Sequence, residues 1–438
     1  MAGKFGSTTI GALLASDGGS VKTGPFGTTL KAKEYSTEGV PLISVGEIGY
    51  GSLRLHASTP RAPREVVERL PEYILEAGDI VFGRKGAVDR SAMVKPEQTG
   101  WFLGSDGIRL RLPNSCDARF IAYQLQSGDT RSWLLQHATG TTMASLNQGT
   151  IERLPIVLPP LDEQRAIAHI LGTLDDKIEL NRQMIETLEA IARVLFKSWF
   201  MEFDPVRAKA EGRDPGLPKS LAVLFPSSFE DSELGEIPKD WEVGTLGDVL
   251  RQRVERCEAS DETASRPYVP IDCITSRSLF LAESKPGMEA QSSLTRFYNG
   301  DLLFGAMRPY FHKVCIAPFD GTTRTTAFVL VPKRSQDFGF ATLLLHHPDT
   351  IDYATRHSTG STIPYAVWTS SLEDMPAVIP PPQVREGFDA AVRPMLDRIP
   401  RPYFENRTLA ALRDTLLPKL ISGELRIEDA DRFVQRHP

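Results

Sequence analysis

The sequence contains the stretch GDIVFG at residues 78–83 and repeats it almost unchanged as GDLLFG at residues 300–305. Two further pairs follow in the same order: TGTTM at 139–143 with TGSTI at 359–363, and IVLPP at 156–160 with AVIPP at 377–381. Their offsets are 222, 220 and 221 residues. Because three matches in one order at nearly one offset rarely arise by chance, they predict a tandem duplication of roughly 220 residues. That period is far above the ~20–50 residues of a solenoid repeat.

Each half begins with short strand-like runs bounded by Gly and Pro clusters, a pattern typical of mixed domains with short strands. The expected strands are 40–45, 80–82 and 108–112 in the first half and 268–271, 302–304 and 327–331 in the second. Each half then ends in helix. The predicted fold class is therefore α+β, with two tandem mixed α/β domains separated by long helices.

The helix that follows the first half carries a heptad seam. It opens after Pro159-Pro160 with acidic residues in its first turn, which suits a helix start. Spacings of four and three alternate along the seam through Ile167, Leu171, Leu174, Ile178, Asn181, Ile185, Leu188, Ala192, Leu195 and Trp199. Apolar residues sustained at this spacing are typical of a coiled coil.

Asn181 is the polar member of this seam. It either fixes the register against a partner asparagine or tilts toward solvent, and the sequence leaves both alternatives open. Asn406 is the candidate partner, because Asn181-Arg182 recurs as Asn406-Arg407.

A second helical segment is expected over about 384–422. Pro394, Pro400 and Pro402 should kink or split its first part, and Ser422-Gly423 should end it. Its apolar face is formed by Leu409, Leu412, Leu416 and Leu420. Because both helices follow equivalent domains and each needs a partner, we expect them to pair as an antiparallel coiled coil.

Composition and charge narrow the range of functions that the chain can have. The chain of 438 residues has a net charge of −6, but residues 160–242 hold 17 acidic and 10 basic residues, so the rest is close to neutral. Basic patches on the flanking domains are therefore compatible with this total. The sequence has no run of 18 apolar residues, so it does not predict a membrane span. The four cysteines lack CxxC spacing, which argues against a zinc site and fits a cytoplasmic protein.

The search for catalytic motifs gave one candidate. The sequence has no GxxxxGK[ST], GxSxG or HExxH pattern. Asp272, followed by Glu283 and Lys285, has the spacing of an acid and an ExK pair, which could hold Mg²⁺ in a self-contained nuclease. This pattern is short and common among 56 acidic residues, so ordinary surface charges are the alternative explanation.

Candidate DNA contacts lie in loops after the repeated strand. In the first half they are Arg84, Lys85 and Arg90, and in the second Arg308, His312, Lys313 and Arg324. Arginine can read guanine edges bidentately, while lysine mostly neutralises phosphate. The repeated Thr-Gly loops add the hydroxyls of Thr141, Thr142, Ser361 and Thr362 as phosphate ligands. For any one of these residues, a solvated loop position is the alternative.

Three stretches carry a resemblance to a known family. LPPLDEQ at 158–164, with the heptad helix after it, resembles the central region of the specificity subunit of Type I restriction–modification systems. Residues 406–425, ending in LPKLISGEL, resemble that family's C-terminal region, and IPKDW at 237–241 with LGD at 246–248 resembles the start of its target-recognition domains. Two departures are visible. The first half has TIG at 9–11 without a Pro-x-x-Trp lead-in, and PPQ at 381–383 replaces the fuller PPLxEQ.

The resemblance implies a non-catalytic specificity subunit that takes part in restriction and phage defence. Each target-recognition domain would read one half of a split, asymmetric sequence in double-stranded DNA, and the coiled coil would set a fixed spacer. The helical regions would dock two methyltransferase subunits. Those partners would bind S-adenosylmethionine, and restriction and translocase subunits using ATP and Mg²⁺ can join them. The chain itself would hold no cofactor or metal.

The expected organisation follows from the repeats and the resemblance. Its segments are target-recognition domain 1 (1–157), the central helix (158–204), a linker (205–240), target-recognition domain 2 (241–379), the C-terminal helical region (380–425) and a tail (426–438). The rival functions are the nuclease and a protein-interaction adaptor with no DNA role.

Overall fold

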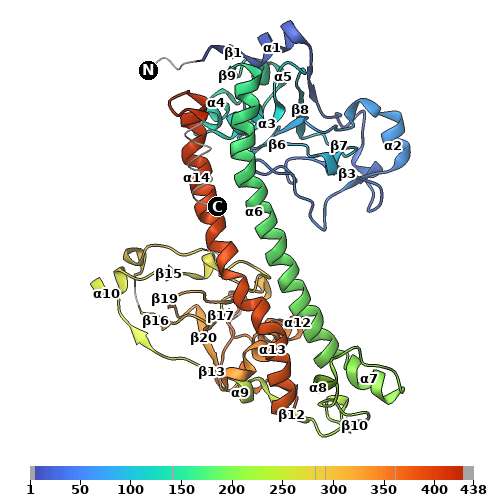
Figure 1. Cartoon of the computed structure of the whole chain (residues 1–438), viewed down its shortest axis with the longest axis vertical. Coiled ribbons are helices and arrows are strands. Elements are labelled where there is room, and N and C mark those ends of the chain that lie inside the picture. Colours follow the sequence, from blue (N-terminus) through green and yellow to red (C-terminus); the bar gives the residue numbers. More distant parts are fainter. Residues whose placement is uncertain (1–4, 141–142, 282, 292, 361, 428–438) are drawn as a thin grey trace. The chain divides into compact units, whose positions relative to one another are not determined.

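The computed structural model describes residues 5–140, 143–281, 283–291, 293–360 and 362–427 (Figure 1). Two compact units form: unit 1 comprises residues 1–179 and 407–438, and unit 2 comprises residues 180–406. Two long helices contribute residues to both units.

Unit 1 is built on a four-stranded antiparallel sheet of order β2-β8-β5-β6 (Ser20–Thr23, Gly107–Arg111, Ile80–Gly83 and Ser91–Met93). A smaller sheet has the order β4-β3-β7 (Arg61–Ala62, Val40–Ile43 and Phe102–Leu103), in which β3 and β7 are parallel. β1 (Ser7–Thr9) pairs with β9 (Pro155–Val157). The helices are α1 (Ile10–Asp17), α2 (Arg64–Arg69), α3 (Ala118–Gln126), α4 (Gly128–His137) and α5 (Gln148–Glu152).

Unit 2 repeats this plan. Its first sheet has the order β13-β20-β17-β18 (Leu250–Gln252, Ala327–Pro332, Leu302–Gly305 and Val314–Ile316). A second sheet has the order β14-β16-β19-β15 (Arg256–Cys257, Leu294–Phe297, Gly321–Arg324 and Tyr268–Val269). β12 (Glu242–Thr245) pairs with β21 (Pro376–Ile379), and β10 (Phe229–Ser232) with β11 (Gly235–Pro238). Between residues 204 and 356 its helices are α7 (Asp204–Ala210), α8 (Lys219–Ala222), α9 (Leu246–Val249), α10 (Asp261–Ala264), α11 (Phe338–His346) and α12 (Pro348–Arg356).

The repeated stretch GDIVFG/GDLLFG forms the same strand in both units. β5 and β17 each lie between a long strand and a hairpin strand of a four-stranded sheet. The aspartate before each strand is buried and bound by arginine: Asp79 by Arg111 at 2.8 Å and Asp301 by Arg253 at 2.9 Å. The expected α+β duplication is confirmed at this level of detail.

The long helices belong to the repeat as well. α6 (Leu161–Phe196) continues as a π-helical turn over Lys197–Met201. The second helical segment divides into α13 (Pro382–Arg398) and α14 (Pro400–Ile421). Asp175 bonds Arg413 at 2.7 Å, and Asn181 bonds Asn406 at 2.9 Å. Residue numbers thus rise along α6 as they fall along α14, so the two helices are antiparallel, as predicted.

The seam residues are mostly covered. Ile167, Leu171 and Leu174 pack in one hydrophobic cluster with α14, and Ile185, Leu188 and Leu195 pack against the core of unit 2. The cluster that contains Ile167 also contains Leu409, Leu416 and Leu420 of α14. Ile178 of α6 and Leu412 of α14 are partly buried against it. The heptad spacing is therefore carried by real packing.

The second helical segment is not split at Pro394, one of the three prolines expected to kink or split it. The chain divides at Pro400, but Pro394 lies inside α13. Val384, Phe388, Val392 and Leu396 form a fully buried face of that helix, and this packing offsets the hydrogen bond that proline cannot make. Pro402 lies in the first turn of α14, where its missing N–H has no helical partner to lose.

The divergent start of α13 keeps the contacts of its counterpart. In α6, Gln164 donates to the carbonyl of Pro159 and accepts from the backbone N–H of Asp117. In α13, Arg385 donates to the carbonyl of Pro380 and pairs with the Asp337 carboxylate. A different side chain thus secures the same junction, which explains how the shorter PPQ sequence still begins the helix.

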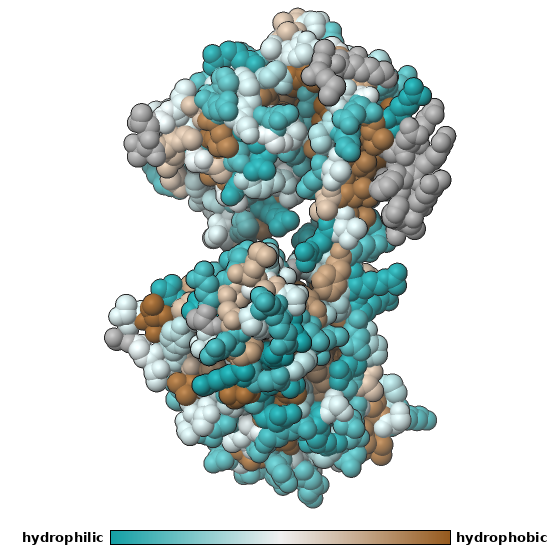
Figure 2. All heavy atoms as spheres, turned by 90° about the vertical axis from the view of Figure 1, so that its left-hand side faces the viewer, coloured by the Kyte–Doolittle hydropathy of each residue, from teal (hydrophilic) through white to brown (hydrophobic). Residues whose placement is uncertain are grey.

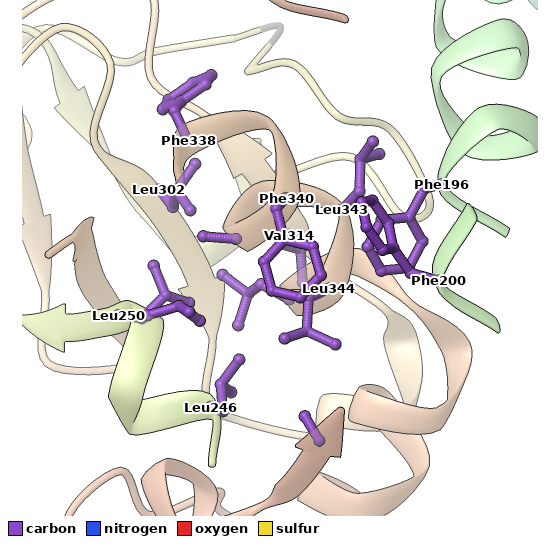
Figure 3. Close-up of a cluster of buried hydrophobic side chains, with 14 of the residues drawn as sticks. Phe196, Phe200, Leu246, Leu250, Leu302, Val314, Phe338, Phe340, Leu343 and Leu344 are labelled. Carbon is purple, nitrogen blue, oxygen red and sulfur yellow. The ribbon is translucent and has the colours of Figure 1, made fainter. Parts of the chain in front are cut away.

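The core of unit 2 gathers aromatic rings around the end of α6. Phe200 lies 4.9 Å from Phe340 and 4.8 Å from Phe388 between ring centroids. Figure 3 shows Phe196 and Phe200 pointing from α6 toward Phe340 and Leu343 of α11. The segment expected to be a linker takes part, since Val206 and Phe225 are buried in the same cluster, as is Trp241 at the start of the expected second domain.

Hydrophilic residues predominate on the face shown in Figure 2, and hydrophobic ones form separate patches. Among the described residues, no helix is long and apolar enough to cross a membrane.

Candidate nucleic-acid interface

The loop after β5 presents the first group of predicted contacts. Arg84 is half-buried, donates to the Ser105 carbonyl at 3.0 Å and lies over the Phe26 ring at 5.1 Å. Lys85 is exposed and pairs with Asp106 at 3.3 Å. These two side chains are therefore held at the surface by neighbours that leave part of their donor capacity available.

Arg90 lies in a different environment from Arg84. Its guanidinium lies 5.5 Å from the Tyr50 ring, which Arg131 also approaches at 4.2 Å. Tyr50 and Arg131 both donate to Asp89. Burial alone would raise the pKa of Asp89, but these two hydrogen bonds lower it below its usual range. The result is a charged network that includes the exposed Tyr50 ring.

A surface pocket of about 530 Å³ lies beside Arg84. Its lining combines cations, aromatic rings and amides, and consists of Lys22, Thr23, Phe26, Tyr73, Arg84, Leu146, Asn147, Gln148 and Gly149. Lys22 lies over the Tyr73 ring at 4.7 Å. Asn147 caps α5 through its side-chain oxygen Oδ1, which accepts from the backbone N–H of Thr150 at 2.9 Å. Sequence reasoning found Arg84 in this group but missed Lys22, Phe26, Asn147 and Gln148, which come from separate parts of the chain.

The loop after β17 is more strained than its counterpart. Arg308 and His312 both adopt left-handed backbone conformations with φ of 53°, which is uncommon for residues other than glycine. Between them Tyr310 and Phe311 are exposed, and their ring centroids lie 4.8 Å apart with the planes tilted. Two exposed aromatic rings therefore stand at the tip of this loop, a feature that the search for basic residues overlooked.

The predicted basic residues of this half do not form one group. His312 is buried, and its ring bonds the His346 carbonyl at 2.9 Å. Lys313 donates to the Ile271 carbonyl at 2.8 Å. Arg324 is exposed at the end of β19, in the second sheet and not in the loop after β17. His312 and Lys313 thus support the loop from inside unit 2, while Arg308 and Arg324 remain nearer to the surface.

The Thr-Gly loops have matching backbones. Thr139 and Ser145 exchange backbone hydrogen bonds, as do Thr359 and Tyr365. Thr362 is exposed in its bend. The other predicted hydroxyls, Thr141, Thr142 and Ser361, lie outside the described residues.

The nuclease candidate residues are exposed. Asp272, Glu283 and Lys285 each lie at the surface of unit 2, and their charges act on the Cys273 thiol, whose pKa is raised chiefly by burial. Within the described ranges, no three His, Cys, Asp or Glu side chains lie together where they could hold a metal ion.

The chain is similar to known proteins in both sequence and fold. Residues 24–190 match the family model described as the Type I restriction modification DNA specificity domain. The chain is also 27% identical over 431 residues to the Type I restriction enzyme MjaIX specificity subunit of Methanocaldococcus jannaschii, across 94% of this chain and 93% of that one. Over nearly its whole length the chain is similar to Type I specificity subunits.

Further similarities extend along the chain. It is 24% identical to the HindI specificity subunit of Haemophilus influenzae, over 70% of this chain and 77% of the relative. A solved S subunit from M. genitalium shares its fold, with a TM-score of 0.60 at 14% identity over 95% of this chain and 96% of that one. The resemblance noted in the sequence is thereby confirmed.

Proposed function

We propose that this specificity subunit reads a split DNA sequence, one part with each duplicated domain, and brings methyltransferase subunits to it. The observation that carries the proposal is the repeated frame. β5 and β17 occupy the same place in sheets of the same order, yet the side chains that follow them differ, as Arg84 and Ala306 do. A shared frame with different reading residues is suited to recognising two different half-sites.

The antiparallel helices suit the role of a fixed spacer. Their seam is apolar except at Asn181, which is buried and bonded to Asn406. A single buried polar pair specifies register in coiled coils. We infer that this register fixes the gap between the two half-sites.

The outer face of α6 supports a docking role. Leu180, Ile191 and Val194 are 62%, 40% and 65% exposed. Apolar side chains on a helix surface are typical of positions that a partner covers. In this proposal two methyltransferase subunits dock on the helices and bind S-adenosylmethionine, and any restriction or translocase subunits use ATP and Mg²⁺. This chain contributes recognition, while the partners contribute the chemistry.

The test is methylation of a random-sequence DNA library by the full chain co-purified with its methyltransferase subunits, with modified adenines mapped by sequencing. We expect a motif in two parts with a fixed gap, and activity that falls as salt rises, because phosphate contacts are screened. Methylation without sequence preference would overturn the proposal. DNA cleavage by the isolated chain that Asp272→Ala abolishes would instead favour a nuclease.

A further inference from the structure

The pocket beside Arg84 contains the side chains that proteins use to read base edges. Arginine matches the two acceptors of guanine, and asparagine and glutamine match the donor and acceptor of adenine. The pocket places Arg84, Asn147 and Gln148 together with Lys22, which suits a neighbouring phosphate. Asn147 and Gln148 are exposed, so the Gln148 amide is accessible from solvent, as is the amide nitrogen of Asn147, whose oxygen caps α5.

Arg84 is held in position before any ligand arrives. Phe26 is 56% exposed, yet the Arg84 guanidinium covers its ring at 5.1 Å, and one N–H of that group donates to the Ser105 carbonyl at 3.0 Å. Within the described part of the chain, Ser105 is the only hydrogen-bond acceptor of this guanidinium. The remaining N–H groups are therefore free to bond a ligand, and the planar group loses little freedom when they do so.

The equivalent place in unit 2 has the same backbone with different side chains. Leu146 donates its backbone N–H to Arg84 at 2.8 Å, and Ala366 donates to Ala306 at the same distance. This match makes Ala306 the counterpart of Arg84, Val367 that of Asn147, and Trp368 that of Gln148. Ala306 and Trp368 are buried in the core of unit 2. The polar set is thus a property of the first domain and is not required by the shared fold.

We propose that Arg84, held against Phe26, reads a guanine in the half-site bound by unit 1, and that Asn147, Gln148 and Lys22 contact the adjoining base edges and phosphate. This inference rests on the proposed DNA-reading function. It adds the site, the base and the domain that reads it.

The experiment compares variants in the same library methylation assay, using the full chain with its methyltransferase subunits. For Arg84→Ala we expect discrimination to fall by about tenfold to a hundredfold at one guanine of one half-site, which is the range for loss of a bidentate contact. The other half-site and the gap should stay unchanged. Arg84→Lys should not restore the preference, because a lysine lacks the planar fork. Phe26→Leu should weaken the same position to a smaller degree.

The matched control is Arg64→Ala. Arg64 lies in unit 1, is exposed and pairs with Glu68 at 2.7 Å, so its loss should leave the motif unchanged. If the Arg84→Ala variant does not assemble with the methyltransferase subunits, the guanine preference of Arg84→Lys and Phe26→Leu tests the same contact.

Three results would overturn the inference: an unchanged motif, an equal loss of methylation at all sequences, or a wild-type motif without guanine in either half. Equal loss would mean that Arg84 contacts only phosphate. A wild-type complex that methylates without any preference would overturn the proposed function itself, so the two failures are distinguishable.

Discussion

The side-chain amide of Asn181 donates a hydrogen bond of 2.9 Å to Oδ1 of Asn406 and another of 2.8 Å to Glu405. Asn181 is only 3% exposed and lies between apolar seam residues of α6. The two asparagines open the repeated Asn-Arg dipeptide, so the duplicated helices meet through the same residue. Of the two alternatives for Asn181, a register contact and a solvent-facing side chain, the structure has the first.

Asn181→Ala should destabilise the protein. The change removes the hydrogen bonds that Asn181 donates to Asn406 and Glu405 in a covered seam, which costs about 1–3 kcal/mol. Urea denaturation of the full chain measures this. As the control, Leu180→Ala on the exposed face of the same helix should change the free energy of unfolding by less than about 0.5 kcal/mol. Equal effects of the two substitutions would contradict the structural role of Asn181.

Removing the Phe200 ring should cost more. Phe200 is 4% exposed and contacts Phe340, Phe388 and Trp241. Phe200→Ala should lower the free energy of unfolding by about 3–5 kcal/mol, because the cavity cannot collapse fully. Val194→Ala, at a site that is 65% exposed, is the control. A loss below about 1 kcal/mol at Phe200 would show that the end of α6 is not packed as described.

Arg385 gives a test of the repeat itself. Its guanidinium pairs with Asp337, and burial raises the pKa of that carboxyl while it lowers the pKa of Arg385. Arg385→Leu leaves a buried carboxylate without a cation and should cost about 3–5 kcal/mol. The double variant Arg385→Gln with Asp337→Asn, which removes the charge and imitates Gln164, should recover part of the loss in chemical denaturation. No recovery would argue against the equivalence of the two junctions.

His346 predicts a loss of stability in acid. Burial, with the nearby charges of His312, Arg193 and His347, lowers its pKa from 6.5 to about 3. The unfolded chain therefore binds a proton that the folded chain does not, so stability is complete above pH 6.5 and falls as the pH drops toward 3. The loss is at most about 5 kcal/mol.

Urea midpoints measured between pH 7 and pH 4.5 test this effect. The variant His346→Phe should flatten the slope of stability against pH, whatever its effect on stability at pH 7. His169→Gln, at an exposed position of α6, should leave the slope unchanged. Some slope will remain in the His346 variant, because burial also lowers the pKa of His312. An identical slope in wild type and His346→Phe would exclude this histidine as the cause.

The repeats and the heptads could be predicted because their signals are local or periodic. Ile80–Gly83 and Leu302–Gly305 are apolar runs with a shared sequence, and the seam of α6 recurs every three or four residues. The pairing of Asn181 with Asn406 was also foreseeable, since both belong to one repeated dipeptide. Such features follow from the chain without knowledge of its neighbours in space.

The remaining features depend on distant contacts. Gly172 is a poor helix former, and its reason appears only in the structure, where Arg119 lies over it and donates to its carbonyl at 3.2 Å. Phe26 and Asn147 lie beside the same pocket as Arg84 but are far from it in the sequence, and no regular spacing connects the three residues. Pro394 stays helical because the helix has a buried face, and intrinsic helix propensity does not take such tertiary packing into account.

The most direct test of the account is to make both domains the same. Strands β1 and β9 pair in unit 1 as β12 and β21 do in unit 2, so residues 7–157 can replace residues 242–379. Methylation of the random library by this chimera, in complex with the methyltransferase subunits, is then compared with that by wild type. If each domain reads one half-site, the modified motif will contain the first half-site twice and lose the second. A motif that still contains the second half-site would contradict the account.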